Sequence, residues 1–126
     1  MRPRLIIKTS LRDRPKEHET SAAMLLMDYF KSDVVFLRPL CQKTPDLEIN
    51  GKTWELKSPK GDGKNTIKNN LHDAREQSVN VIVDLRRIKM SQDKALSRID
   101  YYFKSHRSKI KHLMIILKNG KILEKF

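Results

Sequence analysis

The stretch TPDLEINGKTWELKSP, residues 44–59, contains the strongest local structural signal in the chain. Apolar and polar residues alternate on both sides of Asn50 and Gly51, and Asn-Gly is the preferred turn of a two-residue β-hairpin. Because successive side chains on a strand point to opposite faces, the hairpin has one apolar face and one charged face. The apolar face contains Leu47, Ile49, Trp54 and Leu56, and the charged face contains Asp46, Glu48, Glu55 and Lys57.

The charged face of this hairpin places two carboxylates opposite each other. A two-residue turn pairs Asp46 with Glu55, and like charges in facing positions destabilise a sheet unless a cation lies between them. Lys57 follows on the same face, within reach of a phosphate or a water molecule, and Glu48 flanks the pair. Oxygen ligands of this kind suit Mg²⁺ or Mn²⁺ better than Zn²⁺. The pattern predicts metal-assisted phosphodiester hydrolysis, with a solvated charged hairpin face as the alternative.

The segments around the hairpin predict an α/β (α+β) domain with one mixed sheet. Three segments repeat apolar residues at helical spacing, and Ser91 is a suitable N-cap for the last of them. Four further segments are short apolar runs typical of strands. The predicted helices span about 18–31, 65–78 and 91–104, and the strands outside the hairpin span about 34–40, 80–85, 113–117 and 121–123. The order α-β-β-β-α-β-α-β-β predicts helices on both faces of the sheet.

Length and charge narrow the class of protein. The chain has 126 residues, one Cys and a formal net charge of +12. This length fits one domain, which we place at 18–126, after a basic segment 1–17 that forms either an extension or a strand around 5–7. A single Cys excludes a disulfide framework, and no apolar run approaches the length of a membrane span. The positive charge predicts a polyanionic partner, nucleic acid first and an anionic membrane surface second.

The hairpin and its flanks resemble a known nuclease motif. Pro45-Asp46, a short hairpin and then Glu55-Leu56-Lys57 are similar to the motif of the PD-(D/E)xK nuclease superfamily. Its restriction-endonuclease-like core of helix, three strands, helix and strand agrees with the order predicted for 18–85. The resemblance implies that Asp46 and Glu55 hold a divalent metal and that Lys57 positions or activates the attacking water. It also implies a carboxylate from the first helix, for which Glu19 is the better candidate and Glu17 the reserve.

A second resemblance is closer. The segments WELKSPKG (54–61), NTIKNNL (65–71) and DAREQSVNVIVDLRR (73–87) resemble the C-terminal nuclease domains of bacterial contact-dependent growth inhibition toxins, particularly the tRNA-cleaving group. The resemblance covers about 18–126. It implies a metal-dependent endoribonuclease that acts on tRNA in the bacterial cytoplasm and is neutralised by a cognate immunity protein. It also allows delivery from a secreted or surface-displayed parent protein.

Six side chains near the hairpin are candidates for contacts with nucleic acid. Lys60 and Lys64 occupy the loop after the strand that carries Lys57, where they are placed to hold backbone phosphates. Arg86 and Arg87 follow a predicted strand, and ligands of open sheets gather near the carboxyl ends of strands. The remaining two candidates, on or near the following helix, are Arg75 and Gln77. A solvated charged surface is the alternative for all six.

Two alternatives to the ribonuclease interpretation remain open. The same fold and the same residues also suit a DNA endonuclease of the toxin, restriction or mobile-element type. A nuclease scaffold that has lost its activity would instead bind nucleic acid without cleaving it. Within the enzyme interpretation, His18 beside Glu19 is an alternative general base. The basic C-terminal third offers a surface for nucleic acid or for an acidic inhibitor protein.

Overall fold

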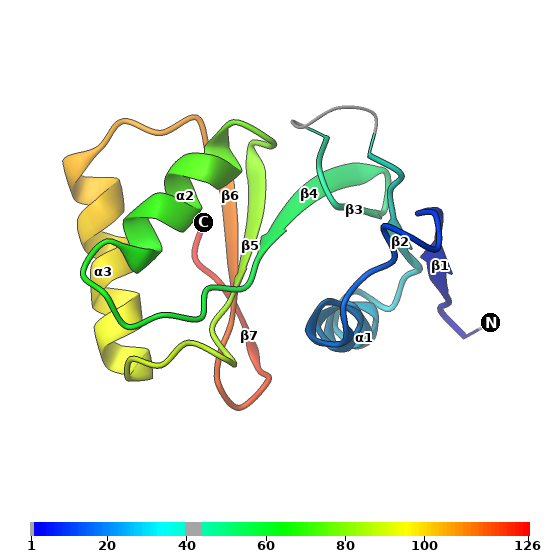
Figure 1. The fold of residues 1–126 in the computed structure, drawn as a ribbon, viewed down its shortest axis with the longest axis horizontal. Helices are drawn as coiled ribbons and strands as arrows, with labels where there is room; N and C mark the ends of the chain where they lie inside the picture. The colour runs from blue at the N-terminus through cyan, green and yellow to red at the C-terminus, as the bar shows by residue number, and fades with distance from the viewer. Residues whose placement is uncertain (1, 40–43) are drawn as a thin grey trace.

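A mixed sheet of seven strands organises the described part of the chain, in the spatial order β1-β2-β3-β4-β5-β6-β7. The computed structural model describes residues 2–39 and 44–126 (Figure 1). The strands are β1 Leu5–Ile7, β2 Val34–Phe36, β3 Leu47–Ile49, β4 Lys52–Lys57, β5 Asn80–Asp84, β6 His112–Ile116 and β7 Ile122–Glu124. The helices are α1 Glu17–Phe30, α2 Thr66–Arg75 and α3 Gln92–Ser105. This mixed α+β architecture confirms the predicted fold class.

The hairpin β3–β4 has the register that its turn predicts. Leu47 pairs with Trp54, and Ile49 pairs with Lys52. Asn50 and Gly51 have φ angles of 52° and 79°, the left-handed values that a type I′ turn requires. The strongest local signal in the sequence is therefore confirmed at the level of individual residue pairs.

The strands on the two sides of the hairpin run differently. β2 is antiparallel to β3, and β3 is antiparallel to β4. In contrast, β4, β5 and β6 are parallel to one another. Helices connect the parallel pairs, because parallel strands need a long crossover: α1 lies between β1 and β2, α2 between β4 and β5, and α3 between β5 and β6. β4 thus joins an antiparallel region to a parallel region.

Two hydrophobic cores lie on opposite faces of this sheet. α1 packs against the apolar face of the hairpin, and Ile82 of β5 also belongs to this core. α2 and α3 cover the other face, where they pack against Val81 and Val83 of β5. Adjacent residues of β5 therefore enter different cores, as the alternation of side chains on a strand requires. Helices on both faces were expected, and Figure 1 shows α2 and α3 together on one side and α1 on the other.

The ends of some elements differ from the sequence-based expectation. β2 stops at Phe36, and one further rung follows, in which Leu37 N–H donates to Asp46 O at 2.8 Å. Pro39 has no N–H to extend the ladder, and position 40, the expected end, lies outside the described residues. α2 ends at Arg75 and not near 78, because the next residues form a tight turn in which Gln77 N–H donates to Ala74 O.

Candidate active site

A pair of carboxylates lies at the junction between the two regions of the sheet. Glu55 is in the middle of β4 and only 2% exposed. Asp46 immediately precedes β3, and its Oδ2 accepts a hydrogen bond from Leu56 N at 3.1 Å. This bond ties Asp46 to the strand that carries Glu55, and the two carboxyl groups lie close enough to shift each other's pKa. The structure thus brings together the two acidic residues that the hairpin register places opposite each other.

Burial dominates the electrostatics of this pair. It raises the pKa of Glu55 to about 8, and the negative charge of Asp46 acts in the same direction. Burial also raises the pKa of Asp46, while the Leu56 N–H opposes that change. A carboxylate in this position is therefore costly unless a positive charge offsets it.

Lys57 supplies part of that positive charge. Its Nζ lies 3.4 Å from Glu55 Oε2, and this ion pair lowers the pKa of Glu55. The Lys57 side chain is 20% exposed, whereas that of Glu55 is 3% exposed. Lys57 therefore extends from the buried carboxylate toward solvent, where a phosphate could reach its ammonium group.

The donor set fits a divalent cation. Glu55 Oε1 is buried and has no hydrogen-bond partner among the described residues. Mg²⁺ is typically held by one or two carboxylates, with waters and substrate phosphates as its other ligands. No cluster of three or more His, Cys, Asp or Glu side chains suited to a metal occurs in the described ranges 2–39 and 44–126. Asp46 and Glu55 therefore offer a two-carboxylate site with an open side.

Glu19 does not join this pair. Its Oε1 accepts a hydrogen bond from Lys16 N at 2.9 Å, which makes it the capping residue of the first turn of α1. Its charge still contributes to the raised pKa of Asp46, so the two carboxylates interact through space. Glu17, the reserve candidate, is exposed on the same turn.

Arg86 and Arg87 make structural contacts at the end of β5. Arg86 Nη2 lies 2.8 Å from Oδ2 of the fully buried Asp84, and its Nη1 donates to Ser21 Oγ of α1 at 2.7 Å. Arg87 donates to Ser58 O, directly after β4, through Nη2 at 2.9 Å. These bonds connect α1 and β4 to β5. Arg86 therefore acts as an internal anchor, and the expected phosphate contact does not account for its position.

His18 lies beside this anchor. Its main-chain oxygen accepts a hydrogen bond from Arg86 Nη2 at 3.2 Å, and burial together with the charge of Arg87 lowers the pKa of its ring. A shallow pocket of about 390 Å³ is lined by His18, Glu17, Ser21 and the two arginines. The pocket leaves His18 accessible from solvent.

The other four predicted contacts lie on two segments, the loop after β4 and the end of α2. Lys60 and Lys64 are exposed on the loop after β4, and this loop is held in place because Arg98 Nη1 donates to Lys64 O at 2.8 Å. Arg75 and Gln77 lie at the far end of α2. Beside them, Ser78 Oγ donates to Thr53 O at the start of β4.

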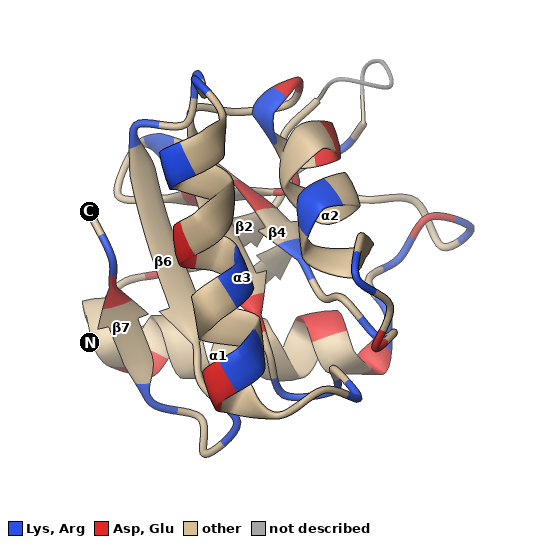
Figure 2. Ribbon diagram, turned by 90° about the vertical axis from the view of Figure 1, so that its left-hand side faces the viewer, with Lys and Arg blue, Asp and Glu red and all other residues tan. Residues whose placement is uncertain are grey.

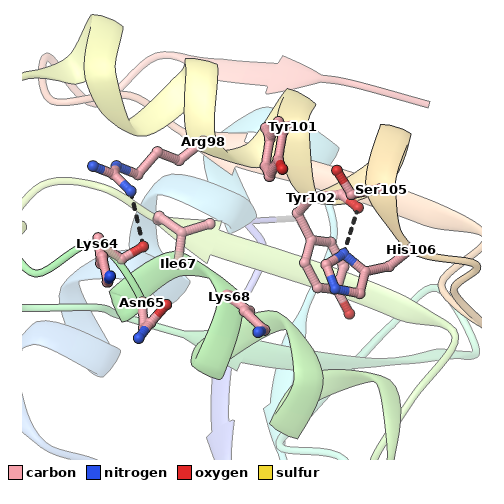
Figure 3. Close-up of a pocket in the computed structure, with 9 residues that line it drawn as sticks. All are labelled: Lys64, Asn65, Ile67, Lys68, Arg98, Tyr101, Tyr102, Ser105 and His106. Atoms are coloured by element: carbon pink, nitrogen blue, oxygen red, sulfur yellow. Dashed lines mark hydrogen bonds between the residues drawn. The ribbon is translucent and has the colours of Figure 1, made fainter.

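A cleft between α2 and α3 was not anticipated from the sequence. It is lined by Lys64, Asn65, Ile67, Lys68, Arg98, Tyr101, Tyr102, Ser105 and His106 (Figure 3). Of these residues, Lys64 alone is among the six predicted contacts with nucleic acid. The sequence feature that could have indicated this cleft is Tyr101. It is an aromatic residue next to the buried Tyr102, but it lies on the outer face of α3.

The fold of this chain is shared with a protein of known structure. The chain is similar to a solved structure, the CdiA-CT/CdiI toxin and immunity complex from Burkholderia pseudomallei, with a TM-score of 0.65 and 23% sequence identity. The match covers 96% of this chain and 97% of that one, so the two share their fold from end to end. None of the curated protein sequences compared with it matches the chain.

The family follows from the sequence match. Residues 43–122 match the model of the contact-dependent growth inhibition CdiA C-terminal domain, and the chain belongs to this family. It is therefore a toxin domain of a contact-dependent growth inhibition system, derived from a secreted or surface parent protein. In the part of the chain that the structure describes, no helix has the length and apolar character needed to cross a bilayer.

Proposed function

We propose that this toxin domain is a metal-dependent endonuclease of the PD-(D/E)xK type that cleaves RNA, with tRNA as the favoured substrate. The single observation that carries the proposal is the pair formed by the buried Glu55 and the partly buried Asp46, with an unpartnered Glu55 Oε1 and with Lys57 at 3.4 Å. A purely structural hairpin has no reason to place a second carboxylate beside a buried one, because facing like charges destabilise a sheet and the charge of Asp46 disfavours ionisation of Glu55.

The residues of the hairpin take distinct roles in this proposal. Asp46 and Glu55 hold the cation, Mg²⁺ or Mn²⁺, and the cation when bound stabilises negative charge that develops on the scissile phosphate. Lys57 orients the attacking water and contacts a phosphate oxygen with its ammonium group. Leu56 N–H fixes Asp46 in position. Glu19 adds negative charge near Asp46 from the first turn of α1.

The substrate and the partner follow from charge and family. A net charge of +12 favours a polyanion, and its binding should weaken steeply as salt concentration rises. The preference for tRNA rests on the resemblance to tRNA-cleaving growth inhibition toxins. The structurally similar toxin is in complex with an immunity protein. By analogy, we propose that a cognate acidic immunity protein binds this basic domain and neutralises it in the bacterial cytoplasm.

A cleavage assay with two substrates tests the proposal. Purified protein is incubated with total tRNA and, separately, with plasmid DNA, each with Mg²⁺, with Mn²⁺ and with EDTA. We expect discrete cuts in tRNA that disappear with EDTA and with Glu55→Gln, while the control Glu48→Gln on the same hairpin retains them. Cleavage of plasmid alone would support the same catalytic site but change the proposed substrate from RNA to DNA. Intact nucleic acid under all conditions would refute the enzyme and favour a binding module.

A further inference from the structure

The cleft between α2 and α3 combines three features that suit a nucleotide. Its volume is about 540 Å³, and it lies outside the carboxylate site. Lys64, Asn65 and Lys68 line it from the α2 side, and Arg98, Tyr101 and His106 line it from the α3 side, as Figure 3 shows. A cleft of this size falls within the range of small-ligand pockets.

The first feature is an uncompensated positive charge. Lys64, Lys68 and Arg98 line the cleft, and the nine lining residues include no Asp or Glu. Lys64 and Lys68 are exposed, and α2 begins between them. Asn65, the N-cap, makes no side-chain capping bond, so the partial positive charge of the helix end adds to that of the lysines. Lys and Arg residues on α2 and α3 also mark this face in Figure 2.

The second feature is the exposed aromatic ring of Tyr101, which is next in sequence to a buried aromatic residue. Tyr101 is 70% exposed on α3. Its neighbour Tyr102 is buried and rigidly held, because its hydroxyl is 3.1 Å from His72 Nδ1 and its ring stacks on His106 at a centroid distance of 4.7 Å. Tyr102 therefore belongs to the core, whereas Tyr101 leaves a planar apolar surface free for contact.

The third feature is the position of the cleft along the chain. The loop that begins after Lys57 leads directly to Lys64 and Asn65 at the cleft entrance. Seven residues span at most about 25 Å even when fully extended. The cleft entrance at Lys64 therefore lies no more than about 25 Å from Lys57.

We propose that this cleft binds an unpaired nucleotide of the RNA substrate within about 25 Å of the scissile bond. The base stacks on Tyr101, and Lys64, Lys68 and Arg98 hold its phosphate. Stacking on a protein side chain needs a base that is not already stacked in a duplex. The substrate class is therefore folded RNA with unpaired nucleotides near the cleavage site, and continuous duplex is excluded. The choice of RNA rests on the proposed function, whereas the preference for an unpaired base rests on the cleft.

Binding measurements test this site separately from cleavage. Fluorescence anisotropy of a labelled single-stranded oligoadenylate and of a labelled RNA duplex is measured in the Glu55→Gln background, where cleavage does not interfere. Tyr101→Ala should weaken binding of the single strand by about 5- to 100-fold and leave duplex binding within about twofold. Tyr101→Phe should restore the single-strand affinity, because the ring retains its stacking face. Tyr29→Ala, at another exposed tyrosine, is the matched control and should have no effect.

Lysine variants and an acidic polymer complete the test. Lys68→Ala should weaken both RNA ligands and reduce the salt dependence of binding by about one counterion. Equal single-strand affinity of Tyr101→Ala and its parent would overturn the proposal. The proposal would also be overturned if Tyr101→Ala weakened polyglutamate binding as much as single-strand RNA binding. That result would make the cleft a site for an acidic peptide. Because binding is the readout, absence of cleavage by the wild type would refute the proposed function and leave this comparison intact.

Discussion

Replacing Glu55 with Gln removes a buried charge and changes how stability responds to pH. The folded protein raises the pKa of Glu55 from 4.5 to about 8, because burial and the charge of Asp46 disfavour its ionised form. Between these two values the unfolded chain has released a proton that the folded protein still holds. The unfolded state then binds fewer protons than the folded state, so the free energy of unfolding falls as the pH rises through this window.

The size of this effect follows from the shift. Each pH unit inside the window changes the free energy of unfolding by about 1.4 kcal/mol. From about pH 5 to about pH 7.5, metal-free wild type should lose about 3 kcal/mol through Glu55. Glu55 is only 2% exposed, so solvent offers little screening. In Glu55→Gln this part of the pH dependence disappears, because the amide does not titrate.

Urea denaturation in the presence of EDTA, at both pH values, measures the difference. Glu48→Gln is the matched control, because Glu48 faces Thr53 in the same hairpin and makes no pair with Asp46. Added Mg²⁺ should stabilise the wild type at the higher pH and leave Glu55→Gln unchanged, since a ligand that binds only the folded state raises its stability. Parallel loss of stability in wild type and Glu55→Gln would refute the argument from burial.

Three further predictions concern other residues. Lys57→Met removes the ammonium group and should lower the single-turnover rate of tRNA cleavage at least about 100-fold, while Mg²⁺ still raises the melting temperature. Asp84→Asn leaves Arg86 without its charged partner and should lower the free energy of unfolding by about 3 kcal/mol in urea; an unchanged midpoint would contradict the anchoring role. Gly51→Ala should cost about 1–2 kcal/mol, whereas Lys52→Ala should be near neutral. No atom lies within 4 Å of the added Cβ, so the φ of +79° is the cause.

Much of the fold was accessible from sequence because its decisive signals are local. Asn50-Gly51 determines the hairpin register through backbone geometry alone, and that register puts Asp46 opposite Glu55. The helices followed from apolar periodicity, and Ser91 caps α3 as expected, with its Oγ accepting from Lys94 N. The positions of elements were thus more predictable than their ends, which depend on individual turns.

The remaining features depend on contacts between distant segments. The role of Arg86 is determined by Ser21 and the main chain of His18, more than sixty positions away. Sequence proximity to a strand end suggested a ligand contact, but these tertiary partners engage its guanidinium group. The α2–α3 cleft likewise needs both helices in place before Lys68 and Tyr101 line one cavity. No periodicity or short motif encodes such a pairing.

The order of the sheet has a consequence for how the domain assembles. Each strand lies beside the strand that precedes it in the sequence, so a chain that emerges from one end adds its strands one at a time without opening a sheet already formed. Once residues 44–57 have emerged, the hairpin that carries Asp46, Glu55 and Lys57 can close on α1. The segment 66–105 then covers the opposite face and creates the cleft. The order of elements therefore allows the carboxylate pair to form before the cleft between α2 and α3.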